Sequence, residues 1–120
     1  MRLLVHRLYI FRSFHFYINE LNSTMQFEAF NNAVSGNEPP AGLNQYALSM
    51  WYDAKGDWEK AHQLVQDVPG ETAAWIHAYL HRKEGDKGNA AYWYRLAGKD
   101  MPAYSLEKEW KEIVQSVLQE

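Results

Sequence analysis

A short phrase, Gly-Asp-x-x-x-Ala, occurs twice in this chain of 120 residues. The first copy begins at Gly56 and ends at Ala61, and the second runs from Gly85 to Ala90. Each copy follows an apolar stretch with helical spacing. Self-similarity at a fixed period of roughly 20–50 residues is typical of stacked helix pairs, because one pair cannot bury its apolar face alone. The repeat therefore predicts an all-α fold of antiparallel helix hairpins, with Ala61 and Ala90 at the points of close contact.

Helix-breaking residues divide the chain after Met25 into six expected helices, the outer two of which should cap the array. Gly56 is placed to end one helix, and Asp57 and Ser105 are placed to N-cap others. No stretch after Met25 alternates between apolar and polar residues, so the pattern excludes a sheet. The charged residues of the last helix, Glu109 among them, are expected to face solvent. We expect helices at about residues 26–35, 43–55, 58–67, 71–84, 87–97 and 105–119.

Residues 1–24 differ from the rest of the chain in composition. They hold three arginines and one acidic residue, Glu20, so residues 25–120 carry a net charge of −5, from nine basic and fourteen acidic residues. Arginine and histidine interrupt the apolar run, which excludes a signal peptide and a membrane span. We expect residues 1–24 to be a non-native extension upstream of a start at Met25, or disordered, and residues 25–120 to form a single helical-repeat-like domain. A targeting segment and a genuine packed element are the alternatives.

The composition excludes several classes of function. The chain has no cysteine, which removes disulfides, thiolate nucleophiles and cysteine-bearing zinc sites. Its net charge of −3 comes without a basic block, so there is no nucleic-acid footprint. The sequence has no nucleophile elbow, glycine-rich phosphate loop or evident pair of catalytic acids. We therefore expect a non-catalytic cytoplasmic protein without a cofactor, a monomer or small homo-oligomer that contacts neither nucleic acid nor membrane.

The two central units resemble tetratricopeptide-type repeats, including the related SEL-type family. That pattern combines small residues, which let two helices approach closely, with larger residues that fill the gap to the next hairpin. The resemblance covers about residues 43–98 and implies a scaffold that binds a protein or peptide. The period of about 29 residues is shorter than the roughly 34 of that family. The chain from Met25 onward also resembles a family of small, uncharacterised bacterial proteins, a resemblance that implies no known activity. The matching positions are Leu48, Ser49, Tyr52, Ala61, Val65 and Val68 in the first unit, and His77, Ala78, His81, Ala90, Tyr94 and Ala97 in the second.

Three histidines lie at positions that suit a shared ligand. His77 and His81 are four residues apart on one face of the helix expected at 71–84, the face that should meet the helix at 87–97. His62 borders the apolar stripe of the helix at 58–67. Such a set could hold Zn²⁺ or a similar ion, with Asp53 or Glu84 as further ligands. The alternatives are imidazoles that fill the core with hydrogen-bonded partners, or that contact a polar small ligand or peptide.

Aromatic and arginine side chains suggest a second kind of site. Surfaces that combine aromatic rings with arginine are enriched at interface hot spots. We expect such a surface along a groove formed by the helices at 43–55 and 71–84, where a peptide or partner protein would bind. The alternative is that the flanking helices cover these rings. The expected anchors are Trp51, Trp75, Tyr79, Arg82, Tyr92 and Arg95.

Overall fold

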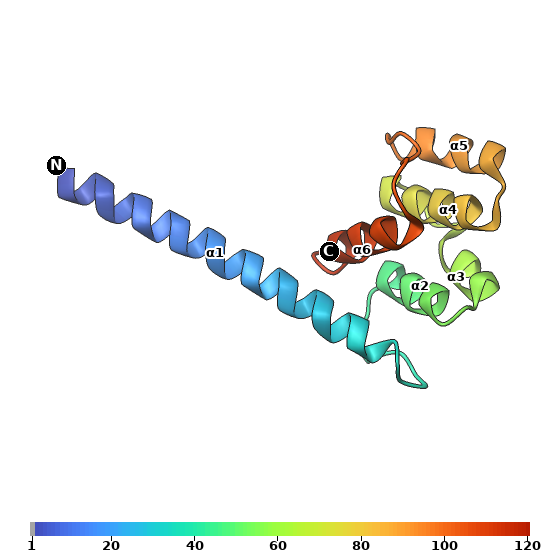
Figure 1. Cartoon of the computed structure of the whole chain (residues 1–120), viewed down its shortest axis with the longest axis horizontal. Helices are drawn as coiled ribbons and strands as arrows, with labels where there is room; N and C mark the ends of the chain where they lie inside the picture. Colours follow the sequence, from blue (N-terminus) through green and yellow to red (C-terminus); the bar gives the residue numbers. More distant parts are fainter. Residues whose placement is uncertain (1) are drawn as a thin grey trace.

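The computed structural model describes the backbone of residues 2–120 and the side chains of residues 13–120. Within this part of the chain the fold is all-α, as the sequence predicts, with no strand. A compact body of helices occupies one end of the molecule, and one long helix projects from it (Figure 1). The helices are α1 (Arg2–Ala33), α2 (Gln45–Ala54), α3 (Trp58–Val65), α4 (Glu71–Glu84), α5 (Lys87–Leu96) and α6 (Leu106–Val117).

The long helix α1 differs from the expectation for the N-terminal part of the chain. The short helix expected at 26–35 is the end of one continuous helix that starts at Arg2, so residues 2–24 are helical as well. The physical reason is that neither glycine nor proline occurs before Gly36, so nothing ends the helix earlier. Only the C-terminal part of α1 lies against the body; Phe27 and Phe30 are buried there.

The two Gly-Asp phrases form the same turn. Gly56 and Gly85 have φ angles of +84° and +90°, the left-handed conformation that glycine adopts at little cost. Asp57 and Asp86 then N-cap α3 and α5, and each carboxylate accepts a hydrogen bond from the backbone N–H three residues on, at 3.1 Å and 3.2 Å. These turns fold α3 back on α2 and α5 back on α4, which confirms the predicted hairpins.

Helix α4 lies at the centre of the body, where it packs against α2, α3, α5 and α6. Nine consecutive residues, Ala73 to His81, are buried, as expected for a helix that is apolar nearly all round. Small residues lie at the helix contacts: Ala61, Ala78 and Ala90 have no exposed surface. The Ser49 hydroxyl donates a hydrogen bond to the Ala61 carbonyl at 2.8 Å, so α2 and α3 are in close contact.

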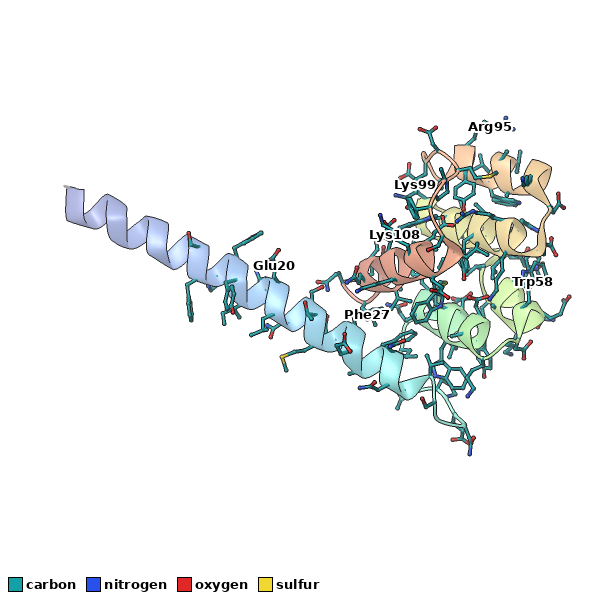
Figure 2. All side chains as sticks on the ribbon, in the orientation of Figure 1. Glu20, Phe27, Trp58, Arg95, Lys99 and Lys108 are labelled. Atoms are coloured by element: carbon teal, nitrogen blue, oxygen red, sulfur yellow. The ribbon has the colours of Figure 1, made fainter. Side chains whose placement is uncertain are left out.

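The last helix, α6, covers one side of α4 and receives the end of α1. Ser105 N-caps α6, as predicted. The rings of Phe27 and Phe30 lie 6.1 Å and 5.9 Å from the ring of Trp110 on α6 (Phe27 is labelled in Figure 2). Among the described residues, no helix combines the length and the apolarity that crossing a membrane requires.

Candidate metal centre

The three histidines meet at the junction of α3, α4 and α5. One nitrogen of each imidazole lies within 4.8 Å of a nitrogen of both others. His62 Nε2 and His77 Nε2 are 2.9 Å apart, and the His81 ring centre lies 4.8 Å from that of His77. His77 and His81 are neighbours because they are one helical turn apart, and the packing of α3 on α4 adds His62. The pair faces α5, where Trp93 lies on His77, and α3 covers it as well.

Two tryptophans hold the histidine rings in place. Trp58 stacks on His62, one turn away on α3, with ring centres 4.8 Å apart and an interplanar angle of 11° (Figure 2 labels Trp58). Trp93 of α5 stacks on His77 at 3.9 Å and 22°. Both tryptophans are partly buried. Trp58 is further fixed by its indole N–H, which donates to the Leu80 carbonyl at 2.8 Å. Stacking restricts ring rotation, so the trio is pre-organised.

Glu84 orients the third histidine. Its Oε1 lies 2.7 Å from His81 Nδ1. A carboxylate in this position holds the ring hydrogen on Nδ1 and leaves the Nε2 lone pair for a ligand, as in carboxylate–histidine–zinc arrangements. Asp86 lies close enough to form a second acid-bearing group with His81 and Glu84. Its carboxylate already caps α5, however, so the histidine trio is the better-formed centre.

Two of the three imidazoles are held neutral at pH 7. Burial, reinforced by the neighbouring His62 and His81, lowers the pKa of His77 to about 4. Burial and the nearby His81 also lower the pKa of His62. The physical cause is that a low-dielectric environment disfavours the charged imidazolium. A metal ion binds only the neutral ring, so no proton has to leave these two residues when a metal binds near neutral pH.

His77 Nδ1 is a buried nitrogen without a hydrogen-bond partner. At 2.9 Å, only one of the facing Nε2 atoms of His62 and His77 carries a hydrogen. We assign that hydrogen to His77 Nε2. His77 Nδ1 is then a bare lone pair, whereas the other assignment would leave an N–H at Nδ1 buried without an acceptor, which is the costlier state. A metal ion between the two Nε2 atoms would replace this hydrogen bond.

The two acids expected as further ligands have different surroundings. Glu84 adjoins the trio, as described, whereas Asp53 does not. Asp53 is buried on α2 and accepts hydrogen bonds from the Tyr79 hydroxyl and from Lys83 Nζ, both at 2.9 Å. Those two donors satisfy the Asp53 carboxylate, and burial beside it raises the pKa of Tyr79. Asp53 is therefore part of a separate polar group between α2 and α4.

The expected aromatic and arginine surface is not formed. Trp51, Trp75 and Tyr79 are 2%, 9% and 2% exposed, and each ring donates a hydrogen bond inside the body. Arg82 donates to the fully buried Glu109 at 2.8 Å. The reason is that α6 packs on α2 and α4, and the end of α1 meets Trp51 through the Ala33 carbonyl, which is the alternative given above for these rings.

The other two expected anchors, Tyr92 and Arg95, are exposed on α5 (Figure 2 labels Arg95). Helix α5 contributes no residue to a cleft of about 600 Å³ that opens where α1, α2, α4 and α6 meet. Of the expected anchors, Tyr79 alone lies in the wall of this cleft. Other lining residues include Phe27, Val34, Leu106, Trp110 and Lys111.

Sequence reasoning missed Glu109, which was expected to face solvent. Its carboxylate accepts hydrogen bonds from Trp75 Nε1 at 3.1 Å, from Arg82 and from the Tyr94 hydroxyl, which lies 2.7 Å and 2.8 Å from its two oxygens. Burial and this carboxylate together raise the pKa of Tyr94, so the phenol stays a donor. A signal existed: Glu109 lies three residues after Leu106 and four before Ile113, within the apolar stripe of α6.

Comparison with known proteins leaves the histidine geometry as the main guide to function. No protein-family model, curated protein or solved structure matches this chain. The resemblance to tetratricopeptide-type repeats therefore remains an expectation from the sequence.

Proposed function

We propose that this chain is a metal-binding helical protein, which holds one divalent transition-metal ion of the Zn²⁺ class on His62, His77 and His81. The observation that carries the proposal is the convergence of three imidazoles within 4.8 Å from two separate helices. An all-imidazole donor set suits Zn²⁺, Cu²⁺ or Ni²⁺ and is unsuited to Mg²⁺ or Ca²⁺, which prefer oxygen ligands.

The observed spacing is close to what such an ion needs. Zn²⁺ binds imidazole nitrogen at about 2.0–2.1 Å, so two tetrahedral ligands lie about 3.3 Å apart. His62 Nε2 and His77 Nε2 are 2.9 Å apart, so these two atoms would have to move slightly apart to bind one ion. The nitrogens of the trio lie within 4.8 Å of one another, so His81 would have to move closer to the other two rings. These movements must be made by rings that Trp58 and Trp93 hold by stacking, so binding an ion requires a small adjustment of the packed cluster. Three protein ligands leave the fourth position to water.

The hydrogen bonds of His81 and His77 bear on how tightly the site would hold a metal ion. Glu84 supplies the outer acceptor for His81, and such acceptors raise the basicity of a ligating ring. His77 Nδ1 has no comparable acceptor. Metal binding through Nε2 moves the His77 hydrogen to Nδ1, where it is unpaired, and this cost weakens the site. We therefore expect a tighter site if an acceptor were introduced there, and an exchangeable ion in the natural protein.

The test is calorimetric titration of Zn²⁺ into the metal-free full chain. We expect one ion per chain and no binding of Mg²⁺. His62→Gln removes one ligand at a half-buried position and should weaken binding by more than about 100-fold, because loss of an outer partner of a ligand alone costs about 10–100-fold. The matched control is His15→Gln on α1, which lies outside the trio and should bind as the parent does.

Two results would contradict the proposal: absence of stoichiometric Zn²⁺ binding by the parent chain, or unchanged binding by His62→Gln. The other hypothesis, capture of a peptide by a helical scaffold, loses four of its six anchors to the interior. It remains a prediction that now depends on the cleft between α1, α2, α4 and α6.

A further inference from the structure

The part of α1 that precedes Gln26 carries an apolar stripe that no other described part of the chain covers. Phe14, Tyr17, Leu21 and Met25 follow one another at intervals of three or four residues and are 61%, 62%, 45% and 61% exposed. This part of the helix projects away from the body, with no other helix beside it (Figure 1). Contiguous exposed apolar patches mark interaction sites, whereas a single exposed residue such as Phe16, 65% exposed on the opposite face, does not.

The stripe lies on a different side of α1 from the side that packs on the body. At about 100° per residue, Phe14, Tyr17, Leu21 and Met25 fall on one face, whereas the buried Phe30 falls on the opposite face. A second helix that lies along the stripe therefore does not compete with the chain's own body for the same face.

We propose that the stripe pairs with the same stripe of a second copy of this chain, so that two α1 helices form an antiparallel dimer. Apolar residues at intervals of three and four are the pattern of helices that pack side by side along a seam. The spacing of the four stripe residues is nearly the same when it is read from either end of the helix. An antiparallel pair places Phe14 of one copy near Met25 of the other, and Tyr17 near Leu21.

The apolar area of the stripe is at the lower limit for a specific pair. Aromatic side chains bury about 150–250 Å² each, so the exposed parts of the four stripe residues offer roughly 400–500 Å² per copy. Two copies then contribute close to the total of about 1,000 Å² that specific interfaces exceed. Neighbouring residues along the pair of helices add to this area.

The charge distribution favours a second copy over a membrane surface. Helices that lie on membranes are rich in Lys and Arg along the polar face, whereas residues 13–33, the part of α1 that bears the stripe, contain neither; the three arginines of α1 lie in residues 2–12. The arginines of residues 1–24 precede the stripe. Of the acidic residues, Glu20 lies between Tyr17 and Leu21 in the sequence, and Glu28 follows Met25.

Sedimentation equilibrium of the metal-free full chain in a chelator tests the dimer separately from the metal site. We expect a dimer for the parent chain, and at least a 100-fold weaker dimer for Tyr17→Glu combined with Leu21→Glu. Because both side chains are exposed, the melting temperature of the variant's body should equal that of a parent sample diluted to monomer. The matched control is Phe16→Glu, on the opposite face of the same helix and 65% exposed, which should leave the dimer intact.

The absence of cysteine allows the orientation to be tested by single introduced cysteines. A mixture of Phe14→Cys and Met25→Cys chains should form the mixed disulfide on oxidation, and Phe14→Cys alone should not cross-link. Three outcomes overturn the proposal. They are a parent chain that stays monomeric at every concentration, cross-linking of Phe14→Cys with itself, and capture by phosphatidylserine vesicles that the Tyr17→Glu, Leu21→Glu variant loses.

Discussion

Arg82 and Arg95 show why a residue's role depends on its partners rather than on its type. Both were expected to bind a partner protein. Arg95 is exposed on α5, whereas Arg82 is mostly buried and forms an ion pair with Glu109, which has no exposed surface. Arg82 also donates to the Tyr104 carbonyl, so it links α4 to α6 and to the loop before α6.

Arg82→Ala should therefore destabilise the protein. The change leaves the buried Glu109 without its counter-ion, and breaking a buried ion pair costs about 3–5 kcal/mol. We expect a loss of about 3 kcal/mol in the free energy of unfolding, because Tyr94 and Trp75 still donate to the carboxylate. Urea unfolding followed by circular dichroism measures it. Arg95→Ala is the control and should change stability by no more than about 0.5 kcal/mol. Equal stability of the two variants would show that the Glu109 network contributes nothing.

At the scale of the helical elements, local sequence was a good guide wherever the cause of an element is local. The turn at Gly85-Asp86 follows from two adjacent residues, one that adopts a positive φ and one that caps the next helix. The bounds of α3, α4 and α5 lie close to their expected positions. The extent of α1 was not predicted, because composition suggested a separate segment although nothing in residues 2–33 breaks a helix.

The Gly85 turn can be tested against a glycine that has no such role. Gly85 has a φ of +90° with open space around it, so Gly85→Ala meets no clash but must hold a left-handed backbone. That conformation costs an L-residue roughly 1–2 kcal/mol. Gly88 lies inside α5, also in open space and without a positive φ, so Gly88→Ala should stabilise the protein by up to about 1 kcal/mol. Thermal unfolding should shift in opposite directions for the two variants, and a shift in the same direction would contradict this account.

At the scale of the whole molecule, the candidate metal centre shows the limit of reasoning from sequence. The His77–His81 pair follows from a spacing of four residues on one helix, so the sequence could propose it. The approach of His62 and the two covering tryptophans depends on how α3 and α5 pack on α4, which no local pattern specifies. Glu109 and the buried anchors depend in the same way on the placement of α6 and the end of α1.

The packing around the trio predicts how the metal-free protein responds to acid. The folded state lowers the pKa of His77 from 6.5 to about 4, and that of His62 is lowered too. At pH values between these two pKa values the unfolded chain binds more protons than the folded chain. The free energy of unfolding therefore decreases as the pH falls from about 6.5 towards 4. The shift of His77 corresponds to at most about 3 kcal/mol at the acid end.

Urea unfolding in a chelator at several pH values between 7.5 and 5 measures this loss. This pH interval lies above the range in which most carboxyl groups titrate. His77→Gln replaces the titrating ring by a neutral side chain, so the variant should lose less stability than the parent over the same interval. A His77→Gln variant with the parent's slope would mean that folding does not lower the pKa of His77, and the environment inferred for this ring would be wrong.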